Sequence, residues 1–231
     1  GVMTVVDHTV DGNTASGNDA TTPGAAGGGG IYNEGGTVNL SGTTTIINNV
    51  ADGAQSTGGG ILNAAGTLMA DGISIMDNTA NRAGGGIETN GGGAVMLTNV
   101  NLDSNDAGVV TGAGAPGNGG GLHVSGNSAV TVTGGTVNMN TAASEGGGLW
   151  NGTGIMTVDG ATIDANTASG ATAAEGGGGI YALTNGTVNL INGTTVSNNI
   201  ADGASGSGGG ILVDADASFS ASDSFITGNQ A

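Results

Sequence analysis

The sequence predicts an all-β fold: one right-handed parallel β-helix of about eight coils, with three strands in each coil. The first observation behind this prediction is composition, because 52 of the 231 residues are Gly, whereas the chain holds only two Phe, one Trp and two Tyr. A globular core needs large side chains to fill its centre. This composition instead favours a thin core with many tight corners. The second observation is that two short motifs recur along the whole chain.

The first motif is a run of glycines followed by Ile or Leu. The residues that follow the runs are Ile31, Ile61, Ile87, Leu122, Leu149, Ile180 and Ile211. Glycine suits a corner because it adopts a left-handed φ and lets backbone approach backbone closely. No Lys follows these runs and no helical period begins there, so they are not phosphate-binding loops.

The second motif is an aliphatic residue followed three positions later by Asn and then, after one residue, by Ala, as in VDGNTA from Val10 and IDANTA from Ile163. Its asparagines are Asn13, Asn49, Asn78, Asn105, Asn140, Asn166, Asn199 and Asn229. Asn tolerates turn conformations, and stacked amides can form hydrogen bonds along an axis. The column therefore predicts a structural Asn ladder rather than a binding or catalytic site.

Short segments with period-two alternation, such as TVNL from Thr37, separate the two motifs. Each unit thus reads as strand, turn, strand, turn, strand and loop. Because such a unit cannot bury its inner face alone, units are expected to stack about 4.8 Å apart and to close a continuous core. Connections between parallel strands are right-handed by strong preference. We expect residues 1–231 to form one solenoid that is uncapped at both ends, and either continues in a longer chain or stacks head to tail on copies of itself.

The charge is one-sided, since Arg82 is the only Lys or Arg against 18 Asp and Glu. A net charge of −17 argues against nucleic acid as a partner, because phosphate binding needs cations. It argues equally against anionic membrane surfaces, and no run approaches the roughly 18 apolar residues of a membrane span, so we expect no membrane insertion. The acidity favours solubility. No cofactor is expected, and no metal site is predicted beyond weak calcium binding by acidic loops such as Asp214 to Asp216.

The residue after each conserved Ile or Leu is expected to point outward. Down the coils this column reads Tyr32, Leu62, Glu88, His123, Trp150, Tyr181 and Leu212. It contains the only Trp and both Tyr of the chain, and exposed rings are natural stacking partners for sugars or another protein. We therefore predict an exposed binding column. The alternative is that the loops fold back over these side chains and make them a minor outer core.

Enzymatic chemistry finds no support in the residue pattern. A polysaccharide lyase needs a cationic base or charge stabiliser, and only Arg82 is available. A hydrolase needs two facing carboxylates. Asp103 and Asp164 occupy equivalent outward positions, but Met76 interrupts their column. Ice binding is weighed because the column from Thr9 to Thr195 is rich in hydroxyl groups, and it is set aside because no second parallel Thr column accompanies it.

The paired motifs GGG[IL] and [IVL]xxN resemble the GGA[ILV] and FxxN repeats of chlamydial polymorphic membrane proteins, with Gly in place of Ala and an aliphatic residue in place of Phe. In that family the repeats form the β-helical passenger of autotransporter adhesins. The resemblance implies an extracellular or cell-surface location. We expect a non-enzymatic structural protein, a fibre subunit or adhesin stalk that binds copies of itself. The alternative is an adhesin module that binds a surface glycan or a protein receptor.

Overall fold

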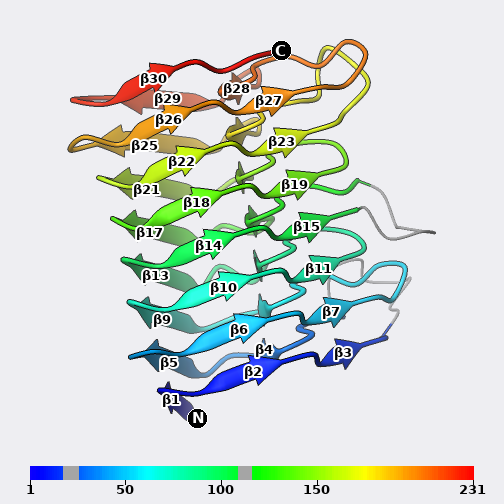
Figure 1. Cartoon of the computed structure of the whole chain (residues 1–231), viewed down its shortest axis with the longest axis vertical. Helices are drawn as coiled ribbons and strands as arrows, with labels where there is room; N and C mark the ends of the chain where they lie inside the picture. Colours follow the sequence, from blue (N-terminus) through cyan, green and yellow to red (C-terminus); the bar gives the residue numbers. More distant parts are fainter. Residues whose placement is uncertain (18–25, 109–115) are drawn as a thin grey trace.

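The chain winds around a single axis as a parallel β-solenoid, which confirms the predicted all-β parallel β-helix. The computed structural model describes residues 1–17, 26–108 and 116–231, and these residues contain strands and turns but no helix. In Figure 1, with the N terminus at the bottom, the nearer strands run left to right and the fainter ones return right to left as the chain climbs, so the winding is right-handed. Residues 18–25 and 109–115, which belong to two of the longer loops, lie outside the described part.

Two eight-stranded sheets run along the rod. Sheet A consists of β1 (Val2–Val6), β5 (Thr37–Ser41), β9 (Thr67–Asp71), β13 (Ala94–Thr98), β17 (Ala129–Thr133), β21 (Ile155–Asp159), β25 (Thr187–Ile191) and β29 (Ser218–Ala221). Sheet B consists of β2 (Thr9–Asp11), β6 (Thr45–Ile47), β10 (Ser74–Met76), β14 (Asn101–Asp103), β18 (Thr136–Asn138), β22 (Thr162–Asp164), β26 (Thr195–Ser197) and β30 (Phe225–Thr227).

Two seven-stranded sheets complete the cross-section. Sheet C consists of β3 (Thr14–Ala15), β7 (Val50–Ala51), β11 (Thr79–Ala80), β15 (Asp106–Ala107), β19 (Thr141–Ala142), β23 (Thr167–Ala168) and β27 (Ile200–Ala201). Sheet D consists of β4 (Ile31–Asn33), β8 (Ile61–Asn63), β12 (Ile87–Thr89), β16 (Leu122–Val124), β20 (Leu149–Asn151), β24 (Ile180–Ala182) and β28 (Ile211–Val213). Every strand pairs in parallel with its counterpart one coil away, for example Ile75 with Ile46 and Leu102.

The number of strands per coil differs from the prediction. A full coil has four strands rather than three, because the Ala of the second motif and the residue before it form a two-residue strand, such as Val50–Ala51. Two residues are too few to show alternation, so in the sequence they read as part of a corner rather than as a strand. Six coils, from β4 to β27, carry all four strands, and the coils at either end carry three. The rod therefore has about seven turns rather than eight.

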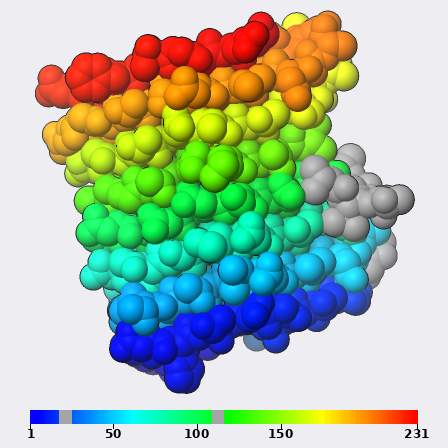
Figure 2. Space-filling view, in the orientation of Figure 1, coloured from blue at the N-terminus to red at the C-terminus, as the bar shows by residue number. Residues whose placement is uncertain are grey.

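The core is a narrow column of aliphatic side chains that come from three of the four sheets. Ile61 of sheet D, Leu68 of sheet A and Ile75 of sheet B are all fully buried, and their counterparts in the other interior coils behave alike. Figure 2 shows the coils as parallel layers across the face that sheets B and C build. Among the described residues no helix is long and apolar enough to cross a membrane.

The corners explain the small residues of the motifs. The residue before each ladder Asn has a left-handed φ in every coil, for example 55° at Asn48 and 53° at Met139. In the glycine run, Gly58 has a φ of 64°. A Cβ on the next residue, Gly59, would lie 2.4 Å from each of two backbone carbonyl oxygens. The runs are therefore glycine because backbone from neighbouring strands leaves no room for a side chain.

Candidate functional site

The Asn ladder runs without a break through eight coils, from Asn13 to Asn229. Each amide donates from Nδ2 to Oδ1 of the Asn in the next coil, over 2.9 to 3.0 Å at all seven steps. The backbone N–H of each Asn donates to the same oxygen, as at Asn105, whose N lies 2.9 Å from Oδ1 of Asn140. The ladder is thus polar in one direction, with donors facing the C-terminal coils.

Each interior amide of the ladder has hydrogen-bond partners in both neighbouring coils. Asn105 also donates from Nδ2 to the carbonyl of Ile75 in the preceding coil, over 3.0 Å. The six asparagines from Asn49 to Asn199 are fully buried. A buried polar group is costly unless it is paired, and here both amide atoms are paired. The ladder holds neighbouring coils in one register.

The exposure predicted for the outward column of sheet D is wrong at most positions. Tyr32 is 51% exposed, and Leu212 is half-buried. The remaining members are buried: Leu62, Glu88, His123, Trp150 and Tyr181. The physical reason is the alternative weighed above, because the loops that lead into the glycine runs fold back over sheet D. Glu145 of one such loop accepts a hydrogen bond from Trp150 of the column, and the Ala174 carbonyl of another accepts one from the Tyr181 hydroxyl.

Three rings of this column stack on one another along the rod. The rings of His123 and Trp150 are 4.2 Å apart at 25°, and those of Trp150 and Tyr181 are 5.9 Å apart at 3°. Adjacent strands place them in register, since His123 pairs with Trp150 and Trp150 with Tyr181. Stacked rings with these separations stabilise each other beyond the area they bury. Because all three rings are buried and Trp150 has a ring on each face, they are not a free platform for a sugar.

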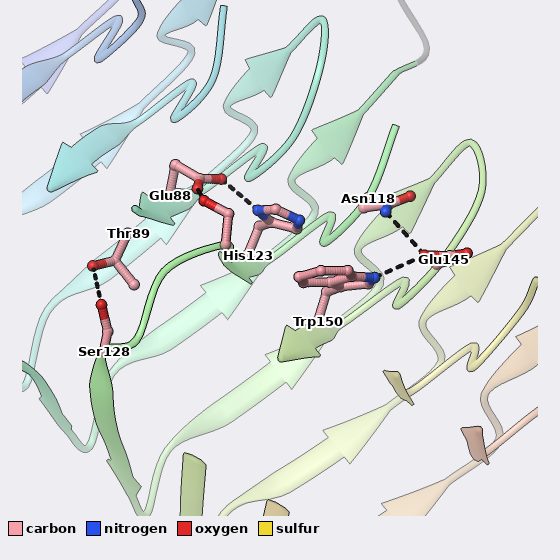
Figure 3. A network of polar contacts seen from close by, with 8 residues as sticks. Glu88, Thr89, Asn118, His123, Ser128, Glu145 and Trp150 are labelled. Atoms are coloured by element: carbon pink, nitrogen blue, oxygen red, sulfur yellow. Dashed lines mark hydrogen bonds and ion pairs between the residues drawn. The ribbon is translucent and has the colours of Figure 1, made fainter. Parts of the chain in front are cut away.

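A polar network lies beside the His123 and Trp150 rings (Figure 3). Nδ1 of His123 lies 2.6 Å from a carboxylate oxygen of Glu88, and the Ser125 hydroxyl donates to the other oxygen over 2.5 Å. Farther along, the Trp150 indole N–H donates to Glu145 over 2.8 Å, and the Asn118 amide donates to the same oxygen over 2.9 Å. This network was not predicted from the sequence. The signal that could have indicated it is that an acid, Glu88, and a histidine, His123, occupy the same column in successive coils.

Burial changes the acidity of two groups in this network. Burial of the Glu145 carboxylate raises its pKa, and the nearby Glu175 adds to the rise, while the Trp150 hydrogen bond opposes it. Burial likewise raises the pKa of the Tyr181 hydroxyl, with the negative charge of Glu145 adding to it. Both shifts follow from the cost of placing a charge in an apolar environment. The charged form of the Glu145 carboxylate therefore opposes folding.

The outward carboxylates of sheet B bridge neighbouring coils rather than face each other. Asp11 accepts from the Asn48 amide over 2.9 Å, and Asp164 accepts from Asn198 over 2.8 Å. Asp103 accepts from the Thr136 hydroxyl over 2.9 Å. Each side chain is used to tie one coil to the next.

Within the described ranges, no group of three or more His, Asp or Glu side chains lies close enough together to hold a metal ion. Asp214, in the loop predicted to bind calcium weakly, accepts from the backbone N–H of Ala215 and from the Thr184 hydroxyl, at 2.7 and 2.9 Å. Those hydrogen bonds, that of Ala215 first, lower the pKa of Asp214. Calcium binding at this loop stays a prediction.

Comparison of the chain with protein-family models, curated proteins and solved structures finds no match. The resemblance to the chlamydial repeats therefore depends on the two motifs alone.

Proposed function

We propose that this chain is a non-enzymatic structural element of an extracellular or cell-surface protein, a rigid β-helical stalk segment or fibre subunit. The observation that carries the proposal is the unbroken Asn ladder beside a continuous aliphatic core. Buried amides at 2.9 to 3.0 Å hold each coil to the next. Buried side chains in this chain serve mainly to hold coils together.

Identical coil junctions also support growth along the axis. Each interior coil presents Asn donors on one side and Asn acceptors on the other, in the same register. A further coil of the same pattern, from the same chain or from a second copy, would find matching partners. Solenoids of this kind are approximately one-dimensional, since each repeat contacts only its neighbours. Extension therefore needs no interface beyond the one that the interior coils already use.

The burial of two rings favours this proposal over the alternative of a glycan-binding column. That alternative required Trp150 and Tyr181 to be open to solvent, and both are buried in the ring stack. Tyr32 is the one exposed ring of the column.

Two measurements test the proposal. Antibodies raised against residues 1–231 are expected to label intact cells of the source organism, and labelling that appears only after permeabilisation would contradict a surface location. Negative-stain microscopy of the concentrated, purified chain is expected to show straight rods on the order of 35–40 Å per copy. Filaments built from such rods indicate a fibre subunit, and separate straight rods indicate a stalk segment. Bent or irregular particles would exclude both.

A further inference from the structure

The outer face of sheet A has properties that neither a stalk nor a fibre requires. We define the A face as the outward side chains at the first, third and fifth positions of the sheet A strands from β5 to β25. Among these positions the only carboxylates are Asp71 and Asp159, although the chain carries 18 acidic residues. The rest are mostly Thr, Ser and Asn with a few apolar residues. The A face is therefore nearly neutral on a protein with a net charge of −17.

Apolar side chains are exposed on this neutral face. Met69 and Met96 are 37% and 40% exposed at the centre of adjacent strands, and Ile155 is 56% exposed. Met69 pairs with Met96 across the sheet, so the two thioethers form one continuous patch. A shallow groove of about 330 Å³ runs beside them. Exposed apolar side chains gathered on a nearly neutral surface are typical of a protein contact.

We propose that the A face is an interface between two copies of this chain, related by a two-fold axis parallel to the rod. Two copies, each with a charge of −17, repel one another wherever their acidic surfaces meet. The A face is where they approach at the lowest electrostatic cost. A side-by-side pair of this kind is independent of stacking along the axis, so it stands whether or not the rod serves as a stalk.

The direction of the two-fold axis follows from the two carboxylates. An axis parallel to the rod keeps each strand opposite its own counterpart and exchanges first and fifth positions. Met69 and Met96 then face themselves, Asp71 faces Thr67, and Asp159 faces Ile155. An axis along the strands would reverse the order of the coils and place Asp71 opposite Asp159. Facing like charges are destabilising, so the parallel arrangement is favoured.

The area limits the strength of the pair. Six strands at about 4.8 Å spacing and five residues at about 3.3 Å give a face of about 30 by 16 Å, so the two copies together bury about 900–1,000 Å². Specific, stable interfaces bury roughly 1,200–2,000 Å². The dimer is therefore weak and depends on concentration. Because a two-fold contact uses the same patch on both copies, association through the A face stops at two.

Sedimentation equilibrium of the purified chain, from about 10 μM to about 1 mM in physiological salt, tests the proposal. The average mass is expected to rise from 21.5 kDa towards twice that value. Any rise beyond two copies would report head-to-tail stacking, which Met96→Glu is expected to leave unchanged. Met96→Glu places two carboxylates opposite each other and is expected to raise the dimer dissociation constant at least tenfold, since each 1.4 kcal/mol is a factor of ten. Met139→Glu is the matched control, because Met139 is 54% exposed but lies away from sheet A.

A monomer at every concentration would overturn the proposal, as would equal effects of Met96→Glu and Met139→Glu. Cross-linking keeps the test independent of any loss of folding in the Glu variants. The chain has no cysteine, so Met69→Cys introduces a single thiol. With a short bis-maleimide, this variant is expected to form cross-linked dimers with itself. Cross-links that appear only when Met69→Cys is mixed with Thr157→Cys would show the reversed arrangement and overturn the proposed axis.

Discussion

Replacement of Asn105 by Ala tests whether the ladder holds the coils together. In the wild type the backbone N–H and the Nδ2 of Asn78 both donate to Oδ1 of Asn105, over 3.1 and 3.0 Å. The substitution leaves the buried backbone N–H of Asn78 without this acceptor, at a cost of about 1–3 kcal/mol. Nδ2 of Asn78 loses one of its three acceptors and keeps the carbonyls of Ile46 and Met76. Loss of the side chain also removes the hydrogen bonds from Nδ2 of Asn105 to the Ile75 carbonyl and to Oδ1 of Asn140. We expect Asn105→Ala to reduce the free energy of unfolding by about 3–5 kcal/mol.

Thermal unfolding followed by the fluorescence of Trp150, the only Trp, measures this effect close to the mutated coil. For a chain of this size, each kcal/mol corresponds to about 2–4 °C, so the midpoint is expected to fall by about 6–20 °C. Asn13→Ala is the matched control. Asn13 is exposed, and its loss removes a donor to Asn49 without leaving a fully buried donor unpaired. We expect that control to cost about 1 kcal/mol or less.

An Asn105→Ala midpoint that falls no further than the Asn13→Ala midpoint would refute the reasoning. It would mean that the aliphatic core alone holds the coils in register. A broad transition, in contrast, would show that the coils on either side of the mutation unfold separately, which is the behaviour of repeat proteins whose cooperativity has been weakened.

Three further outcomes follow from the structure. Met139→Gly is expected to stabilise the chain by about 1 kcal/mol, measured by urea denaturation, because Met139 has a φ of 53° and pays the left-handed penalty that Gly avoids. Gly59→Ala is expected to cost about 3 kcal/mol or to prevent folding, since its Cβ would meet two backbone oxygens at 2.4 Å, whereas Gly35→Ala, with open space around it, is expected to be nearly neutral. Burial raises the pKa of Glu145, so the folded state binds its proton more tightly than the unfolded state. Wild-type stability is therefore expected to fall as the pH rises from the usual Glu range through the raised pKa, and Glu145→Gln is expected to lose that dependence while its amide oxygen still accepts from Trp150. Identical pH profiles for the two proteins would contradict this assignment.

The sequence was most informative where one position faces the same environment in every coil. Inward positions such as Ile75 and ladder positions such as Asn105 contact their own counterparts one coil away. Each coil therefore repeats the same physical requirement, and the requirement appears in the sequence as a column. The parallel β-helix, its core and the ladder could be predicted because repetition makes the signal visible.

The features that the sequence did not predict leave no periodic pattern in it. Val50–Ala51 is too short to show alternation, so the fourth strand could be recognised only from its pairing with neighbouring coils. The burial of Trp150 depends on loops whose lengths vary from coil to coil. No periodic rule describes where Glu145 of such a loop will place its carboxylate. The alternation rule gave the direction of the outward column correctly but could not say what covers it.

The outward surfaces of sheets D and A differ in what contacts them. On sheet D most of the outward column is buried, and its side chains contact one another, as the Glu88 carboxylate contacts His123 in the next coil. On sheet A no described loop covers Met69 or Met96, and both remain exposed although the core would be intact with Thr in their place, as at Thr131 in the same column. The fold does not need an apolar residue at these positions, and the face carries little charge. Contact with a partner accounts for both features. The A face is for this reason the surface on which variants can test association without disturbing the coils.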